Sequence, residues 1–215
     1  MGRYVGKKYR EMEQISTDES TKWVFAWGSD SRIAPWEGFV RHDRYVGFDG
    51  GDFTARAYVE AVTEGLGGAG VLVVPGGLSL RERLDWINGV RGPKVLIVLT
   101  VGYYKPWSGR KGFWIEFPEA GAFGCDEVRM AGSQHLAEVA SLSLRRDLNW
   151  GATLRPSREN YLLDRSDCLG IGIKLGFCSN KVDLMSLVEP RTRDRIREGL
   201  GVMMKNYSPS LLQLS

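Results

Sequence analysis

Ile171-Gly-Ile-Lys-Leu-Gly-Phe-Cys-Ser-Asn180 is the stretch of the chain that most strongly indicates its fold. Its alternating apolar residues predict a strand, and Gly176 predicts a bend because a residue without a Cβ lets the backbone turn or approach another group closely. Ser179-Asn180 ends the strand, and a helical period begins at Val182. In an open α/β sheet, a polar residue at the carboxyl end of a strand faces the crevice where ligands bind, and here that residue is Lys174.

Strand and helix patterns alternate along the rest of the chain. The predicted strands cover residues 22–27, 71–75, 94–100, 112–117 and 161–163. The predicted helices cover residues 53–66, 80–88, 133–148 and 191–207, in addition to the one after Asn180. Ser133 is the expected N-cap of the third of these helices, which places His135 in its first turn and on the surface. This order of elements predicts an α/β fold.

Composition and charge are those of an ordinary globular protein and exclude several functional classes. The chain of 215 residues is 43% hydrophobic and 26% charged, which fits a single domain. A net charge of +3 without a basic stripe argues against nucleic-acid binding, and no apolar run is long enough to span a membrane. Three widely spaced cysteines without a Cys-x-x-Cys motif predict neither a disulfide framework nor a zinc knuckle.

The chain divides into one domain with polar ends. Residues 1–21 are polar and charged and predict an N-terminal arm, residues 22–207 form the α/β domain, and residues 208–215 form a C-terminal tail. The first residues lack the apolar segment of a secretory signal peptide, so we expect synthesis in the cytoplasm without export by that route.

The opening stretch also carries a family resemblance. Residues 174–180, Lys-Leu-Gly-Phe-Cys-Ser-Asn, are similar to a Glu-x-Gly-Phe-x-Ser-Asn motif, and residues 80–88 are similar to a Leu-x-x-Arg-x-x-x-Ala-Asn helix with Arg83 and Asn88 at its structural polar positions. Both belong to the zinc-dependent N-acetylmuramoyl-L-alanine amidases of the amidase-3 type, which are cell-wall hydrolases. The resemblance covers residues 22–207. It implies a twisted, mostly parallel mixed sheet of about five or six strands with helices on both faces.

The residues at the family's catalytic positions differ from those that zinc chemistry needs. At the three zinc-ligand positions the resemblance places Ser29 or Asp30, then Asp49 or Asp52, and then Thr100. At the position of the catalytic glutamate it places Lys174. A hydroxyl such as that of Thr100 is a poor zinc ligand beside imidazole or carboxylate. The Lys174 ammonium cannot act as a base until it loses its proton, and a zinc ion would repel it.

We therefore predict a vestigial site that holds neither zinc nor another cofactor, formed by Ser29, Asp30, Asp49, Thr100 and Lys174. One hypothesis for this site is that the Lys174 ammonium takes the place of the metal charge. It would then pair with one of the carboxylates of Asp30, Asp49 and Asp52, since a buried charge needs a partner. The other is that Lys174 reaches solvent at the mouth of the crevice.

The leading prediction is a catalytically inactive amidase-like domain that serves in binding or assembly. The resemblance implies a groove shaped for a glycan-peptide strand, or a structural block such as a bacteriophage virion (tail) component, because amidase-type domains without signal peptides are common in phage genomes. The expected partners are other protein subunits, further copies of the chain included, and peptidoglycan.

Two enzymatic alternatives stay open at this point. The first is an active peptidoglycan amidase that binds about one zinc ion per chain in a rearranged site formed by Asp30, His42, Asp49 and either Asp52 or Glu116. The second is a different hydrolase in which Cys178 or Cys125 acts as nucleophile with His42 or His135. Two histidines and three cysteines give such pairs by chance, so the second alternative has little support.

Overall fold

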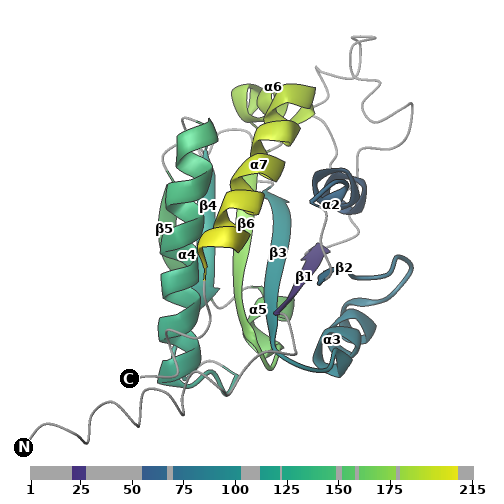
Figure 1. Ribbon diagram of the computed structural model, residues 1–215, viewed down its shortest axis with the longest axis vertical. Helices are drawn as coiled ribbons and strands as arrows, with labels where there is room; N and C mark the ends of the chain where they lie inside the picture. The colour runs from purple at the N-terminus through teal and green to yellow at the C-terminus, as the bar shows by residue number, and fades with distance from the viewer. Residues whose placement is uncertain are drawn as a thin grey trace, which may run out of the picture.

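A six-stranded sheet covered by helices on both faces forms the fold (Figure 1). The computed structural model describes residues 21–27, 55–66, 70–102, 112–121, 123–148, 152–157, 160–177 and 180–207. The predicted tail, and all of the predicted arm except Thr21, lie outside these residues.

The sheet is mixed and mostly parallel. Its strands are β1 (Lys22–Trp27), β2 (Val71–Val73), β3 (Lys94–Gly102), β4 (Phe113–Pro118), β5 (Ala152–Ser157) and β6 (Leu169–Phe177). Their order across the sheet is β2-β1-β3-β6-β4-β5. Every neighbouring pair is parallel except β4 and β6, which run antiparallel. The predicted sheet is therefore confirmed.

The helices divide between the two faces of the sheet. Those in the described residues are α2 (Ala55–Thr63), α3 (Leu80–Gly89), α4 (Glu127–Leu148), α5 (Tyr161–Arg165), α6 (Lys181–Val188) and α7 (Pro190–Asn206). On one face, α4 packs on α7, β4 and β6, and α2 packs on β1 and α7; on the other, α3 and α5 contact each other (Figure 1). From β1 the chain crosses to β2 on one side, and from β2 it crosses back past β1 to β3 on the other side. Right-handed crossovers in these two opposite directions place α2 and α3 on opposite faces of the sheet.

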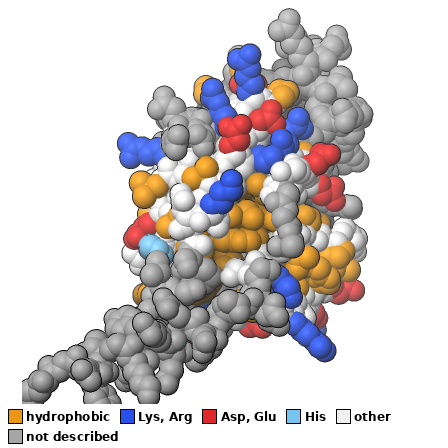
Figure 2. Space-filling view, in the orientation of Figure 1, with side chains coloured by type: hydrophobic (Ala, Val, Ile, Leu, Met, Phe, Trp, Pro, Cys, Tyr) orange, Lys and Arg blue, Asp and Glu red, His pale blue; other side chains and the backbone are white. Residues whose placement is uncertain are grey.

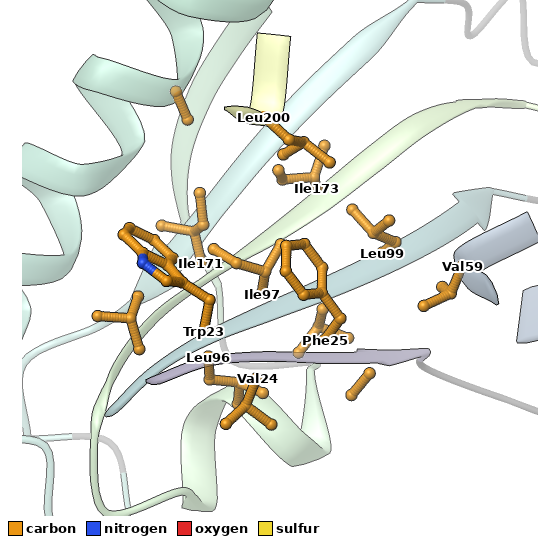
Figure 3. Packing of buried hydrophobic residues seen from close by; sticks show 14 of the residues in the cluster. Trp23, Val24, Phe25, Val59, Leu96, Ile97, Leu99, Ile171, Ile173 and Leu200 are labelled. Carbon is orange, nitrogen blue, oxygen red and sulfur yellow. The ribbon is translucent and has the colours of Figure 1, made fainter. Parts of the chain in front are cut away.

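A continuous apolar core lies on both sides of the central strands. On the α4–α7 face, Phe25, Ile97 and Ile171 lie next to one another on three adjacent strands, and Leu200 of α7 approaches them (Figure 3). Leu96 is also fully buried but points to the other face, because successive side chains of a strand alternate. Both faces of the central strands are thus apolar, as expected for a sheet between two helical layers.

The predicted start of the long helix is wrong. Helix α4 begins at Glu127, and its cap is the Asp126 carboxylate, which accepts a hydrogen bond from the Arg129 backbone N–H at 2.7 Å. Ser133 is buried inside the helix, where its hydroxyl accepts a hydrogen bond from the Gly170 N–H of β6 at 3.1 Å. Aspartate and serine are both good caps, and here a tertiary contact, rather than a cap, satisfies the serine.

The predicted strand at residues 161–163 is also wrong. These residues belong to the short helix α5, which Asn160 caps by accepting a hydrogen bond from the Leu163 N–H at 3.2 Å. Three apolar residues alone have no period that distinguishes strand from helix. The strand of this region is β5 at residues 152–157, which contains Pro156 and lies at the edge of the sheet, where a proline is tolerated.

The surface of the α4–α7 face is mixed in charge. Figure 2 shows basic and acidic side chains interspersed near α6 and α7, with apolar side chains between the helices. Within the described part of the chain, no helix is both long and apolar enough to cross a membrane.

Candidate functional site

Two of the predicted site residues meet at the carboxyl ends of β3 and β6. Thr100 and Lys174 are partners in the parallel register of these strands. Their side chains lie on the α3–α5 face, because they alternate with Leu99 and Ile173, which belong to the core of the opposite face. The remaining predicted site residues lie outside the described residues; these are Ser29, Asp30, His42, Asp49 and Asp52.

Glu116 is the carboxylate that Lys174 contacts. The Lys174 Nζ lies 3.4 Å from the Glu116 Oε1. The Lys174 side chain is 17% exposed and the Glu116 side chain is 6% exposed, so the contact is largely shielded from water. The sequence prediction did not name Glu116 as the partner of Lys174. Glu116 lies on the sheet face opposite to its neighbour Ile115, which is buried in the core.

Arg155 of β5 completes a charged cluster, by which we mean Glu116, Arg155 and Lys174. The Arg155 Nε donates to the Glu116 Oε1 at 3.1 Å, and its Nη2 contacts the same oxygen. Both cations lie against the Trp114 ring: the Arg155 Cζ is 3.9 Å and the Lys174 Nζ 5.4 Å from its centroid. An aromatic face attracts cations, so the ring holds both side chains near the carboxylate.

Strand register explains why these side chains converge. Glu116 is the register partner of Arg155 on one side and of Gly172 on the other, and Trp114 is the partner of Lys174. A Cβ at Gly172 would lie 2.7 Å from the Asn160 Nδ2 and 3.6 Å from the Glu116 Oε2. The glycine therefore leaves the space into which α5 and the Glu116 side chain pack.

The end of β6 is fixed by the helix that follows it. Asn180 caps α6 by accepting hydrogen bonds from the N–H groups of Val182 at 3.0 Å and Asp183 at 3.3 Å. The Asp183 carboxylate accepts from the N–H groups of Phe177 at 3.0 Å and Gly112 at 2.8 Å, so it joins the end of β6 to the residue before β4. The predicted helix start after Asn180 is confirmed, and the bridging role of Asp183 was not predicted.

Gly176 produces the irregularity expected of it. Its φ of 145° lies in a region that favours glycine, and the pairing of β3 with β6 shifts register between Thr100 and Gly102. A Cβ at this position would also lie 3.2 Å from that of Asp183. The strand continues through Phe177, so Gly176 bends β6 rather than ending it.

The described residues of the site do not fit a catalytic zinc ion. Such an ion needs three protein ligands, an open position and a carboxylate that handles the proton. The described candidates are the Thr100 hydroxyl and the charged cluster, whose carboxylate is engaged by two cations. Two cations beside one carboxylate would repel a zinc ion. Among the described residues, no group of three or more His, Cys, Asp or Glu side chains is arranged to hold a metal ion.

The described cysteine and histidine candidates are not arranged for nucleophilic chemistry. Cys125 is buried, and burial raises the pKa of its thiol, whereas a nucleophilic cysteine needs a lowered pKa. His135 lies within α4 rather than in its first turn; its side chain is 43% exposed and its Nδ1 is 4.0 Å from the Glu138 carboxylate. The other two candidates, Cys178 and His42, lie outside the described residues.

Asp164 is a buried carboxylate beside the charged cluster. It belongs to α5 and is 1% exposed, and neither of its carboxylate oxygens has a hydrogen-bond partner among the described residues. Burial raises its pKa to about 6, and the Glu116 carboxylate adds to this rise, while the guanidinium groups of Arg129 and Arg165 oppose it. The folded protein therefore binds a proton at Asp164 more readily than the unfolded chain does.

Asp164→Asn is expected to remove a loss of stability that the wild-type protein shows as the pH rises. The folded pKa of about 6 exceeds the ordinary value of 3.8, so stability is retained below about pH 4 and declines as the pH passes through 6. A difference of about two pKa units corresponds to about 3 kcal/mol. Urea unfolding at about pH 4 and about pH 8 measures most of this difference, with the exposed Asp85→Asn as control. Equal pH dependence of the wild type and Asp164→Asn would contradict the expectation.

Comparison with known proteins identifies the fold. No known protein-family model matches the chain, and neither does any curated protein. Solved amidase structures do match: an N-acetylmuramoyl-L-alanine amidase from Clostridium difficile 630 superimposes with a TM-score of 0.60 at 15% identity, over 88% of this chain and 97% of that one. The amidase AmiC2 of Nostoc punctiforme gives a TM-score of 0.62 at 13% identity, over 86% and 96% of the two chains.

A third amidase structure includes a partner protein. CwlD from Clostridioides difficile, solved in complex with the GerS lipoprotein, matches with a TM-score of 0.60 at 14% identity, over 87% of this chain and 98% of that one. At such identities the likeness defines the fold alone. This chain has the α/β fold of N-acetylmuramoyl-L-alanine amidases, and the similarity spans nearly the full length of both chains.

Proposed function

We propose that this chain is a catalytically inactive, amidase-like domain that acts by contact, in binding or in assembly. The observation that carries the proposal is the ion pair between Lys174 and Glu116 at the carboxyl ends of the strands. The resemblance in residues 174–180 assigns a catalytic glutamate to the position of Lys174. An ammonium group that is paired there can neither ligate zinc nor accept a proton from water.

Two kinds of contact are consistent with the fold. The fold that the chain shares with solved N-acetylmuramoyl-L-alanine amidases supports binding of peptidoglycan without cleavage. The CwlD–GerS complex supports a protein interface on this fold, and we propose assembly with other subunits, such as those of a bacteriophage virion, as the corresponding role. Under either role the chain needs no metal cofactor, and Thr100 and Lys174 belong to a vestigial site.

The metal content of the purified full chain tests the proposal. The protein is incubated with zinc, dialysed, and assayed for bound metal and for the amino groups that hydrolysis of peptidoglycan amide bonds releases. We expect substoichiometric zinc and no new amino groups, because the cations of the charged cluster disfavour a dication. One zinc ion per chain together with amide hydrolysis would establish instead an active amidase with a rearranged site.

A further inference from the structure

The charged cluster carries more positive than negative charge. Two cations, Arg155 and Lys174, contact a single carboxylate, and both contact the same oxygen of Glu116. Among the residues that the structure describes, Glu116 is the only acidic side chain in contact with either cation. The charges of the three side chains therefore sum to +1.

This excess charge lies in a partly desolvated place. The Lys174 side chain is 17% exposed and that of Arg155 is 31% exposed. Both cations contact the Trp114 ring, and a neutral ring compensates only a fraction of a full charge. A cation withheld from water is costly unless an anion pairs with it. Both side chains nevertheless keep some exposed surface, which a ligand anion could contact.

We propose that the charged cluster is a binding site for a carboxylate group of a ligand. This inference rests on the proposed function, because a zinc ion in the same crevice would leave no role for the excess cation. Lys174 and Arg155 donate to the ligand carboxylate, while Glu116 holds the two cations side by side. The Thr100 hydroxyl, on the register partner of Lys174, is a further donor at the same edge.

Charge selects a carboxylate over a phosphate. A singly charged carboxylate neutralises a cluster of net charge +1, whereas phosphate near pH 7 carries a charge of about −1.5 to −2. The surplus negative charge of phosphate would face the Glu116 carboxylate. Charge-assisted hydrogen bonds from a guanidinium and an ammonium suit a carboxylate and are among the stronger polar interactions in proteins. The location also fits, because open α/β sheets bind ligands outside the carboxyl ends of their strands.

Titration with a small monocarboxylate and its neutral analogue tests the inference. The probe is N-acetyl-L-alanine, the analogue is its carboxamide, and binding to the full chain is followed by NMR or calorimetry in low salt. We expect the carboxylate to bind and the carboxamide not to bind. Binding should weaken as sodium chloride is added, because salt screens a partly exposed charge. Equal binding of the two compounds, or tighter binding of inorganic phosphate, would overturn the proposal.

Variants assign the binding to the cluster. Lys174→Met keeps the aliphatic stem and should weaken carboxylate binding about tenfold, the loss expected for one charge-assisted hydrogen bond. Lys174→Arg keeps the charge and should retain binding, and Lys205→Met removes an exposed lysine of α7 as the matched control. Circular dichroism establishes that each variant folds. Unchanged binding by Lys174→Met, or equal losses in Lys174→Met and Lys205→Met, would overturn the proposal.

The two proposals fail in different ways. All titrations use protein freed of metal by a chelator, and the same preparation is tested for amide hydrolysis after zinc is added. Hydrolysis with stoichiometric zinc overturns the proposed function. Absence of hydrolysis, combined with no preference for the carboxylate over the carboxamide, overturns only the carboxylate site.

Discussion

Gly170→Ala should destabilise the fold by about 3 kcal/mol, the upper end of the usual cost of overpacking. A Cβ at this position would lie 2.7 Å from the Leu96 carbonyl oxygen and 2.9 Å from the Leu96 Cβ, both held in the central strand β3. It would also lie 3.3 Å from Leu163 Cδ1 of α5. Backbone atoms of a paired strand cannot give way, so β6 has to move away from β3 or from α5. Urea unfolding measures the loss.

Two other glycines serve as matched controls. A Cβ at Gly172 would lie 2.7 Å from the Asn160 Nδ2, which is the end of a side chain, so Gly172→Ala should cost less than Gly170→Ala. Gly89 lies at the end of α3 with nothing within 4 Å of the added carbon, and Gly89→Ala should leave stability unchanged or raise it by up to about 1 kcal/mol. Equal midpoints for Gly170→Ala and Gly89→Ala would contradict the packing argument.

Glu116→Gln should destabilise the protein by about 2 kcal/mol at neutral pH. The substitution preserves size but removes the carboxylate that Arg155 and Lys174 share, and it leaves the two cations without this common anion. Breaking a fully buried ion pair costs about 3–5 kcal/mol. The expected value is lower because both cations retain some contact with water. Chemical unfolding at low and high salt measures the effect, and salt should reduce it.

A second substitution separates the charge effect from other consequences. Lys174→Met in the Glu116→Gln background removes one of the two repelling cations and should restore part of the lost stability. Asp194→Asn is the control for a more exposed ion pair, because Asp194 lies 3.2 Å from the Arg197 guanidinium and the two side chains are 53% and 29% exposed; it should cost under about 1 kcal/mol. Additive losses from Glu116→Gln and Lys174→Met would show that the cluster is not a coupled unit.

Much of the fold could be predicted from the sequence because its central elements have unambiguous local patterns. The strand at Lys22–Trp27 has the predicted bounds, and the buried strand at Lys94–Gly102 extends two residues beyond its predicted end. Long apolar runs bounded by glycine or polar residues leave few alternatives. The α7 helix is likewise confirmed, with Ile196, Leu200 and Met203 on its buried side.

The charged cluster could be predicted only in part because its partners meet through strand register. The sequence did not indicate Arg155, because the neighbouring Pro156 argues against a strand. A proline is tolerated in β5 because this strand lies at the edge of the sheet. Glu116 was named as a candidate metal ligand, yet its pairing with Lys174 depends on β4 running antiparallel to β6. Local sequence carries no information on which strands become neighbours. The alternation of the Ala152–Ser157 segment was the one signal that could have indicated Arg155.

The three strands that hold the charged cluster also restrict which substitutions its positions accept one at a time. Lys174→Glu would place a second carboxylate beside Glu116, where both would compete for Arg155. Like charges so close oppose each other, so this substitution is unfavourable until Glu116 changes as well. Selection on single substitutions would therefore retain the three charges together.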